Sequence, residues 1–266
     1  MRVAVVGHVE WVQFAEVERV PAPGEIVHAA EVWEEAAGGG AVAAVRLAEL
    51  AGGAALYTAL GADELGTAAA EQLQARGVTV HAARPDQSQR RAFCFVDDGG
   101  ERTITVLGTK LVPSGTDADL PWEDLARTDA VYFVSGDVAA LRQARRARVL
   151  VATSRELPTL QSGAVALDAL VGSGKDEGEA FQPGALDPPP RLVVTTSGSL
   201  GGWAQPGGPY RAAAPSGPIQ DAYGCGDAFA AALAFALAEG RDPSAAIDFA
   251  AEQGAKALTL RGAGIA

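Results

Sequence analysis

The sequence predicts an α/β protein built around a mostly parallel β-sheet that is buried on both faces. Short apolar runs of strand length alternate along the chain with segments that suit amphipathic helices. The runs in the second half are apolar throughout, which is typical of parallel strands covered by helices on both sides. The chain has 266 residues, of which 48 % are hydrophobic and 20 % charged, a composition typical of a folded globular protein.

The first elements are a strand, a β excursion and a glycine turn that leads into a helix. Residues 2–7 form an apolar run that predicts a buried strand. Pro21, Pro23 and Gly24 exclude a long helix in the segment that follows, and the residues after them favour a strand. The triplet Gly38-Gly39-Gly40 then precedes residues 41–51, whose apolar positions suit an amphipathic helix.

The alternation of strands and helices continues to the end of the chain. A second β excursion is expected where two β-prone runs flank a turn-rich segment at 97–102, the pattern of a hairpin. The remaining expected strands are 56–60, 78–82, 92–96, 103–107, 130–134, 149–152, 166–171 and 191–195, and the remaining expected helices are 67–76, 228–239 and 243–258.

Charge and composition exclude several classes of partner. The net charge of −12 would repel nucleic acid phosphates and anionic lipid, so we expect a small-molecule partner, with no nucleic acid and no membrane. The most apolar stretch, 228–238, is shorter than a membrane-spanning helix requires. Only Cys94 and Cys225 are present, which is no disulfide framework, and no export signal is visible, so a cytoplasmic location is expected.

Two glycine clusters resemble phosphate-binding motifs but match them poorly. Residues 38–43 fit a dinucleotide fingerprint, yet no clean buried strand precedes them. The segment Gly172-Ser173-Gly174-Lys175 resembles part of a P-loop. It has Ala169 in place of the first glycine of that motif and Asp176 in place of the required Ser or Thr.

A cluster near the C-terminus carries more chemistry: Asp221-Ala222-Tyr223-Gly224-Cys225-Gly226-Asp227-Ala228-Phe229, followed at once by the most apolar helix. Free backbone N–H groups at a helix N-terminus bind anions, so Gly224, Cys225 and Gly226 would form an anion hole. Asp227 would accept a proton from a substrate hydroxyl that attacks phosphorus. The alternative interpretation is that Asp227 only caps the helix.

Taken whole, this cluster resembles the D-T-x-G-x-G-D-x-F signature of the ribokinase-like (PfkB) carbohydrate kinase family. Other segments follow in the order of that family: 23–25, 100–103, 194–202 and 261–263. The resemblance implies a single domain over 1–266, with a three-layer α/β/α sandwich and a small β lid that closes over a sugar. Residues of about 10–35 and 88–108 would supply the lid.

The resemblance also implies an ATP and Mg²⁺ site. Asp176 and Glu179 look like the acidic motif that acts near the Mg²⁺-bound phosphates, with Asp176 replacing an Asn. Without the resemblance, this pair would be an ordinary acidic helix start. The nucleotide loop would consist of Thr196, Ser197, Gly198 and Gly201, which alone would be a flexible turn after a strand. Besides Glu179, Asp221 is a metal candidate, because the resemblance leaves open a monovalent cation near it.

The acceptor side departs from the family. The chain contains no Asn, so the glycine motif at Gly38, Gly39 and Gly40 lacks the usual substrate-binding amide. The usual Asp after the first strand is absent too, and Glu10 and Gln13 are the remaining hydroxyl-binding groups there. A lone carboxylate in this pocket predicts a neutral or cationic acceptor.

The favoured hypothesis is an ATP-dependent kinase that phosphorylates a hydroxyl of a sugar or sugar-like molecule. A nucleoside kinase is the nearest rival, because Trp11, Phe14 and Trp33 would be able to stack a base. A catalytically silent ligand-binding protein with the same fold is the third hypothesis. A homodimer through the lid is a further expectation.

Overall fold

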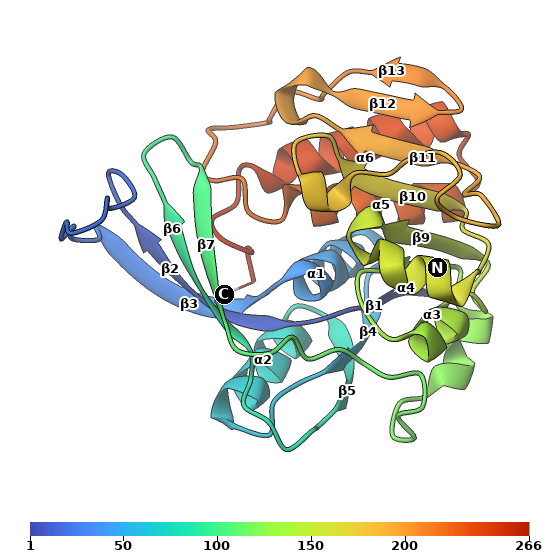
Figure 1. Cartoon of the computed structure of the whole chain (residues 1–266), viewed down its shortest axis with the longest axis horizontal. Helices are drawn as coiled ribbons and strands as arrows, with labels where there is room; N and C mark the ends of the chain where they lie inside the picture. The colour runs from blue at the N-terminus through green and yellow to red at the C-terminus, as the bar shows by residue number, and fades with distance from the viewer. Residues whose placement is uncertain (266) are drawn as a thin grey trace.

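The computed structural model describes residues 1–265, which fold into two β-sheets and six α-helices (Figure 1). The strands of the larger sheet are β1 (Val3–Val6), β4 (Ala54–Ala59), β5 (Val78–Ala83), β8 (Ala130–Phe133), β9 (Val149–Thr153), β10 (Ala169–Ser173), β11 (Val193–Thr196), β12 (Gly202–Gln205) and β13 (Gly208–Tyr210). Their order is β13-β12-β11-β10-β9-β8-β1-β4-β5. All neighbours from β11 to β5 are parallel, and the β12–β13 hairpin is antiparallel. The predicted mostly parallel sheet is confirmed.

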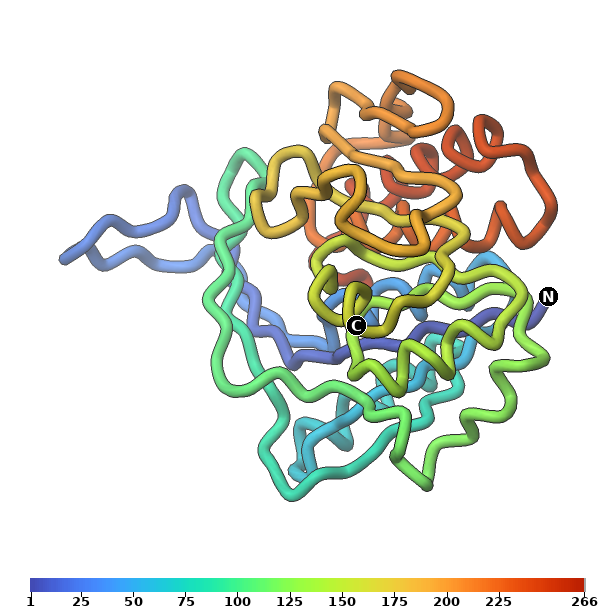
Figure 2. The backbone as a smooth tube through the Cα atoms, turned by 45° about the vertical axis from the view of Figure 1, so that its right-hand side comes forward, coloured from blue at the N-terminus to red at the C-terminus, as the bar shows by residue number. Residues whose placement is uncertain are grey.

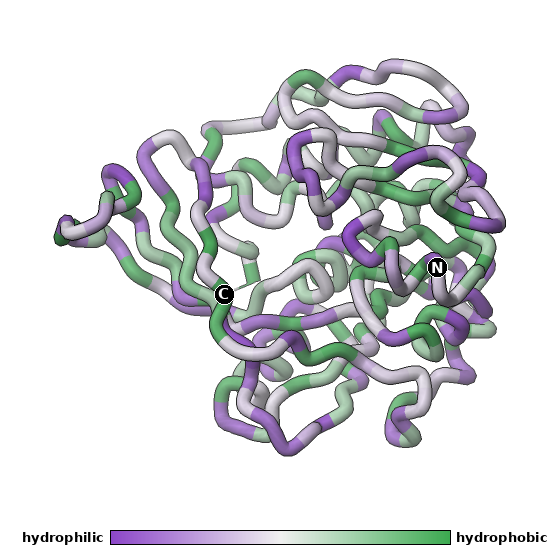
Figure 3. The backbone as a smooth tube through the Cα atoms, viewed as in Figure 1, coloured by the Kyte–Doolittle hydropathy of each residue, from purple (hydrophilic) through white to green (hydrophobic). Residues whose placement is uncertain are grey.

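Helices cover both faces of this sheet. One face carries α1 (Gly39–Ala51), α2 (Glu64–Ala75), α5 (Cys225–Ala238) and α6 (Pro243–Ala257), and the other carries α3 (Val138–Ala144) and α4 (Leu157–Gly163). Alternate residues of β1 serve the two layers: Val3 and Val5 pack toward the first group of helices, and Ala4 and Val6 toward the second. Hydrophilic and hydrophobic residues are mixed along the peripheral loops (Figure 3). None of the helices in residues 1–265 has the length and hydropathy that a membrane span requires.

The two β excursions form one small sheet, here called the lid sheet. Its strands are β2 (Glu10–Glu16), β3 (Glu31–Ala37), β6 (Arg91–Val96) and β7 (Arg102–Leu107), in the order β3-β2-β6-β7. Strand β2 runs parallel to β6 and antiparallel to β3, so segments distant in sequence are joined here. The connection between β2 and β3 extends away from the rest of the molecule (Figure 2).

The lid sheet has one inward and one outward face. Phe14, Trp33 and Cys94 are partners across neighbouring strands and therefore share the inward face. Phe14 and Trp33 stack with 5.0 Å between ring centroids, and Phe14 also contacts Tyr223 edge-on. Gln13 is exposed and belongs to the opposite face, with Phe93 as its partner on β6.

Two local features differ from the sequence-based expectation. Helix α5 begins at Cys225, three residues before the expected start, because the left-handed Gly224 (φ 70°) ends the preceding loop there. The β12–β13 hairpin was not predicted, since its Pro206, Gly207 and Gly208 indicate a loop. Strand β13 is at the edge of the sheet, where Pro209 needs no N–H for a further ladder.

Candidate active site

The candidate site lies where the strand order of the large sheet reverses direction. From β1 the chain adds β4 and β5 on one side, and then β8, β9, β10 and β11 on the other. Ligands of open parallel sheets bind in the crevice that such a reversal leaves at the carboxyl ends of the strands. The adjacent ends of β1 and β8 are in close contact here: a methyl group on Gly7 would lie 2.8 Å from Cβ of Val134. The first turns of α1 and α5 meet in this crevice.

Asp227 is positioned by the first turn of α5. The N-cap of the helix is Gly224 and no side chain caps it, so Asp227 occupies the third helical position and the capping alternative is wrong. Its carboxylate faces the glycine turn of α1, because a methyl group on Gly39 would lie 2.8 Å from Oδ1 of Asp227. No atom lies within 4 Å of the position that a Cβ on Gly226 would take. The start of α5 is therefore open beside a carboxylate.

The surroundings of Asp227 raise the pKa of its carboxyl group toward neutrality. Burial raises its pKa to about 6, and the nearby charge of Glu179 contributes to the increase. The cations of Arg102 and Arg155 and a hydrogen bond from Tyr132 on β8 act in the opposite direction. Asp227 is therefore mostly ionised at pH 7, with a pKa close enough to neutrality for a general base.

The other aspartate of the segment, Asp221, links the loop before α5 to the C-terminal segment through hydrogen bonds. It is 1 % exposed, and its two carboxylate oxygens accept the N–H groups of Tyr223 (2.8 Å) and Gly262 (2.6 Å). Tyr223 in turn accepts a hydrogen bond from the N–H of Gly38 through its hydroxyl, at 3.1 Å. The lid contributes Arg102, which donates to the carbonyl of Ala222 at 2.7 Å. These contacts fix the segment before α5 against the glycine turn and the lid.

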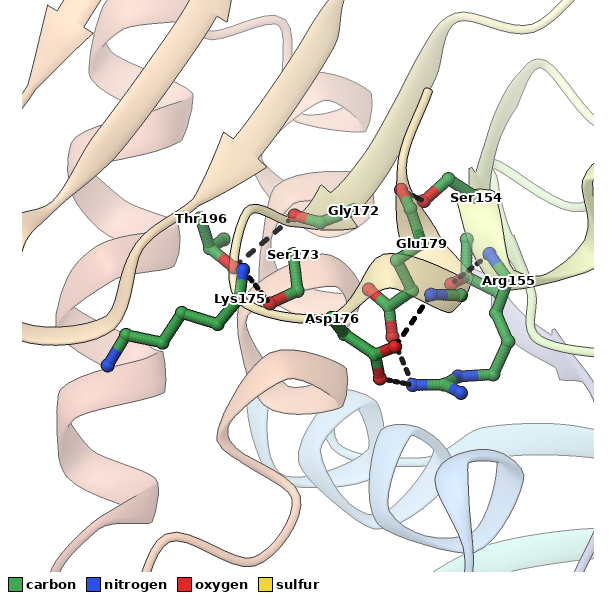
Figure 4. Close-up of polar contacts among 10 residues, drawn as sticks. Ser154, Arg155, Gly172, Ser173, Lys175, Asp176, Glu179 and Thr196 are labelled. Carbon is green, nitrogen blue, oxygen red and sulfur yellow. Dashed lines mark hydrogen bonds and ion pairs between the residues drawn. The ribbon is translucent and has the colours of Figure 1, made fainter. Parts of the chain in front are cut away.

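The predicted nucleotide loop follows β11. Thr196 ends that strand and donates through its hydroxyl to the carbonyl of Gly172 at 3.3 Å (Figure 4). Ser197 and Gly198 begin a short turn that closes at Gly201, whose carbonyl accepts the N–H of Ser197 at 2.7 Å. The ammonium nitrogen of Lys175 lies beside this loop, 3.0 Å from where a Cβ on Gly198 would stand.

The predicted acidic pair follows β10 and is bridged by an arginine. Asp176 and Glu179 lie in and beside a short 3₁₀ turn, Glu177–Glu179, rather than a helix start. Nη2 of Arg155, at the end of β9, contacts Oδ2 of Asp176 at 2.5 Å and Oε1 of Glu179 at 2.6 Å (Figure 4). The structure therefore brings together the pair that the sequence predicted, with a cation that it did not predict.

Comparison with known proteins agrees with this geometry. The family model described as pfkB family carbohydrate kinase matches residues 1–155 and 168–266. The chain belongs to the PfkB family of carbohydrate kinases. No sequence among curated proteins matches it.

Solved structures of PfkB-family kinases share the ribokinase-like fold. Ribokinase from Thermotoga maritima is 21 % identical, with a TM-score of 0.75 over 99 % of this chain and 95 % of that one. Ribokinase from Arabidopsis thaliana, complexed with ribose and ATP, is 22 % identical, with a TM-score of 0.72 over 98 % and 93 % of the two chains. Adenosine kinase from Sinorhizobium meliloti is 18 % identical, with a TM-score of 0.75 over 98 % and 95 %.

On the acceptor side, this PfkB chain pairs its charges internally. Glu10 is 7 % exposed and lies against the glycine turn. A methyl group on Gly38 would lie 3.3 Å from Cγ of Glu10. Its Oε1 contacts Nη1 of Arg90 at 3.1 Å and Nε2 of His8 at 4.0 Å. Burial raises the pKa of Glu10, and the charges of Arg90 and Lys110 act against that rise. Glu10 is thus no lone carboxylate, and the argument for a neutral or cationic acceptor loses its basis.

The remaining predicted substrate residues are the three glycines and Gln13, and they lie on opposite sides of β2. Gly38, Gly39 and Gly40 line the turn beside Glu10 and Asp227. Gln13 is exposed on the outward face of the lid sheet, away from this turn. The structure therefore does not bring Gln13 to the other predicted substrate residues.

The two metal candidates of this PfkB chain differ in fit. Glu179 retains one carboxylate oxygen without a hydrogen bond in residues 1–265, and Mg²⁺ is commonly held by one or two carboxylates together with phosphate oxygens and water. Its position therefore fits a magnesium ion that accompanies a nucleotide. Both oxygens of Asp221 already accept backbone N–H groups, and no cluster in the described residues has three metal-ligating side chains. The role of Asp221 that the structure shows is structural, and a monovalent cation near it stays a prediction.

Sequence reasoning missed three residues near the site. A fourth residue, Arg155, belongs to the segment 152–155, which resembles a reduced form of the family's Asp-x-Asn-x-Arg motif. Tyr132 follows from the topology, which brings the end of β8 beside α5. Lys175 belongs to the segment that does not match the P-loop motif, so no sequence pattern placed it beside the nucleotide loop. Arg90 precedes β6 and pairs with Glu10 across the lid sheet, which no local pattern indicates.

Proposed function

We propose that this PfkB kinase transfers the γ-phosphoryl group of ATP to a hydroxyl of a small polyhydroxylated acceptor. The observation that carries the proposal is the position of Asp227. It is the third residue of α5, a helix that no side chain caps, and its carboxylate faces Gly39. A hydroxyl held against the glycine turn would lie beside this carboxylate. The ATP-bound and ribose-bound ribokinase neighbour supports the same reaction class.

The proposed chemistry is an in-line displacement at phosphorus. The acceptor oxygen forms a bond to the γ-phosphorus, the bond from that phosphorus to the β,γ-bridging oxygen breaks, and ADP leaves. The proton of the acceptor hydroxyl passes to Asp227. The N–H groups of Gly224, Cys225 and Gly226 would stabilise the charge on the transferred group, aided by the positive end of the α5 dipole.

The donor would be held by the ends of β10 and β11. Thr196, Ser197, Gly198 and Gly201 would contact the nucleotide, and Lys175 is close enough to Gly198 to reach its phosphates. Mg²⁺, when bound, would offset phosphate charge, and Glu179 with Asp176 would orient it through its water shell.

A sugar-like acceptor is favoured over a nucleoside. The aromatic side chains that would stack a base are already occupied: Trp33 packs against Phe14, and the guanidinium of Arg261 lies 3.6 Å from the centroid of its ring. Trp11 is 8 % exposed and donates to Glu34 at 2.7 Å. Glu10, whose side chain lies against the glycine turn, and its ion-pair partner Arg90 suit hydroxyl groups.

The test is a coupled ADP-release screen over pentoses, hexoses, sugar phosphates and nucleosides, repeated with Asp227→Asn. We expect a sugar-like acceptor to give the highest kcat/KM. The variant should lose at least about a thousandfold in kcat while ATP affinity stays within a few-fold, because only the proton acceptor is altered. Full turnover in the variant would refute the mechanism. A wild-type protein that binds no nucleotide with or without Mg²⁺ would favour the catalytically silent alternative.

A further inference from the structure

The histidine that follows β1 lies over the glycine turn. A methyl group on Gly38 would lie 3.3 Å from both Cδ2 of His8 and Cγ of Glu10, so these two side chains flank this glycine. The next glycine, Gly39, faces the carboxylate of Asp227 instead. The side chain of His8 is 13 % exposed, so part of the ring is accessible to a ligand. His8 therefore belongs to the acceptor side of the crevice, close to the proposed base.

One ring nitrogen of His8 is held by the fold. Nδ1 is hydrogen-bonded to Oγ of Ser135 at 3.0 Å, and Ser135 is completely buried in the segment that follows β8. The other nitrogen, Nε2, makes no hydrogen bond within residues 1–265 and lies 4.0 Å from Oε1 of Glu10. The ring is therefore anchored at one nitrogen, and the other lies beside a carboxylate.

The surroundings of His8 determine which nitrogen carries the proton. Burial and nearby cations, chiefly Lys110, hold the pKa of His8 well below its usual value, so the ring is neutral at pH 7. A neutral imidazole has one N–H donor and one acceptor nitrogen. The carboxylate of Glu10 favours the N–H at Nε2, and Nδ1 then accepts the hydroxyl hydrogen of Ser135.

The space between Nε2 of His8 and Oε1 of Glu10 suits one hydroxyl group. A distance of 4.0 Å is too long for a direct hydrogen bond, yet one oxygen atom can lie within hydrogen-bond distance of both atoms. A hydroxyl placed there accepts the N–H of His8 and donates its own hydrogen to Glu10, which can keep its contact with Arg90. An ammonium group would only donate and a carbonyl oxygen would only accept, so the pair selects a hydroxyl.

We propose that His8 is a specificity-determining residue of this kinase, whose Nε2–H group binds, together with Glu10, a second hydroxyl of the acceptor. The hydroxyl to be phosphorylated would lie at Gly39 beside Asp227, and the second hydroxyl at the adjacent Gly38. Consecutive Cα atoms are about 3.8 Å apart, so a small polyol would span both positions with two of its hydroxyls. The inference rests on the proposed function and narrows its acceptor to molecules that carry such a pair.

The experiment uses two amide variants that each keep one of the ring nitrogens. The side-chain amide of His8→Gln reaches about as far as Nε2, and that of His8→Asn only about as far as Nδ1. The acceptors are D-ribose, D-fructose and D-fructose 6-phosphate, and KM is compared for the one with the highest wild-type kcat/KM. The matched control is His81→Asn, because His81 is also a partly buried histidine, located on β5 at the far edge of the large sheet.

We expect His8→Asn to raise the KM of the acceptor at least tenfold and leave the KM of ATP within about twofold, because the Nε2 donor is lost. His8→Gln should keep the acceptor KM within about threefold, and His81→Asn should change neither value. If His8→Gln raises the acceptor KM as much as His8→Asn does, or if neither variant raises it, His8 is only a structural link. The inference is then wrong, while the proposed function stands. If the wild type phosphorylates none of the acceptors, both fail.

Nitrogen-15 NMR of the imidazole rings gives a second test that depends on no variant's activity. The chain has three histidines, so the signals of His8 are readily assigned. We expect a neutral ring with its proton on Nε2 in the wild type at pH 7. A proton on Nδ1, or a charged ring, would overturn the inference even where a variant does not fold.

Discussion

The donor and acceptor halves of the crevice differ in how far the protein satisfies its own polar groups. In the donor half, formed by the start of α5 and the ends of β10 and β11, no side chain caps the helix, and within residues 1–265 both side-chain hydrogen bonds of Arg155 come from Nη2. In the acceptor half, Glu10 is paired with Arg90, and the ring of His8 is hydrogen-bonded to Ser135 at 3.0 Å. An open half suits a ligand that brings its own charge, as a nucleotide does. In the acceptor half the polar side chains are already paired, so an acceptor must replace hydrogen bonds that these side chains make with one another.

Gly39 lies between the two halves, and its substitution should impair catalysis more than any other substitution outside Asp227 itself. In Gly39→Ala the added methyl group would lie 2.8 Å from both Oδ1 of Asp227 and Cγ1 of Val134, so the carboxylate must move. A displacement of about 1 Å costs on the order of a hundredfold in rate, and we expect that loss in kcat/KM. Gly217→Ala is the control, because its methyl group would meet only Thr259, at 3.9 Å. Turnover of Gly39→Ala within threefold of the wild type would contradict the claim that close contact with Gly39 positions the carboxylate of Asp227.

Substitution of Glu10 tests whether the internal pairing of the acceptor half governs how the acceptor binds. Glu10→Gln should raise the KM of the acceptor by about tenfold and leave the KM of ATP unchanged, because a charged hydrogen bond of about 1.5–3 kcal/mol is lost. Gln13→Ala should leave both values within twofold, since that side chain lies on the outward face of the lid sheet. An effect of Gln13→Ala equal to that of Glu10→Gln would contradict this division of the strand.

The two aspartates of the signature sharpen the comparison through stability. Asp221→Asn deprives one of two buried backbone N–H groups of its acceptor, and should lower the free energy of unfolding by about 1–3 kcal/mol. Asp227→Asn should do the reverse at neutral pH. Its folded pKa of about 6 exceeds the usual value near 4, so the ionised carboxylate destabilises the fold above pH 6 by up to about 2–3 kcal/mol.

Urea unfolding at pH 4 and pH 8 would measure both effects. The gain from Asp227→Asn should be large at pH 8 and small near pH 4, where the folded carboxyl group is protonated and the unfolded one is about half protonated. A loss of stability in this variant at pH 8 would mean that Asp227 supports the helix rather than the chemistry.

Two neighbours of Asp227 should shift its pKa in opposite directions by smaller amounts. Tyr132→Phe removes a hydrogen bond to the carboxylate and should raise the pKa, whereas Glu179→Gln removes a negative charge and should lower it. The acid limb of kcat/KM should therefore move upward in the first variant and downward in the second, each by about half a unit to one unit. Shifts of the same sign in both variants would refute the arrangement around Asp227.

The oligomeric state was predicted to be a homodimer through the lid, and this stays a prediction. The outward face of the lid sheet carries the exposed Val32 and Leu107 and the half-buried Phe93 and Phe95. Sedimentation of the wild type would measure the state directly. A dimer that becomes monomeric in Phe93→Ser, with its folding intact, would support the lid interface.

The sequence predicted the donor half better than the acceptor half, for a physical reason. A helix N-terminus with Gly224, Gly226 and Asp227 is a local arrangement, so contiguous residues specify it completely. The parallel strands were predictable for the same reason, since each is a continuous apolar run. Glu10 and Arg90 are far apart in sequence and meet through the parallel pairing of β2 with β6, which only the fold reveals.

The pH dependence of kcat/KM in the wild type tests the central claim, that Asp227 is the proton acceptor, most directly. The account predicts that kcat/KM rises with pH through a single apparent pKa near 6 and is level above it, because only the ionised carboxylate accepts the proton. This limb should be missing from the residual activity of Asp227→Asn. A wild-type profile that is flat between pH 5 and 8, or a limb that survives in the variant, would contradict the account.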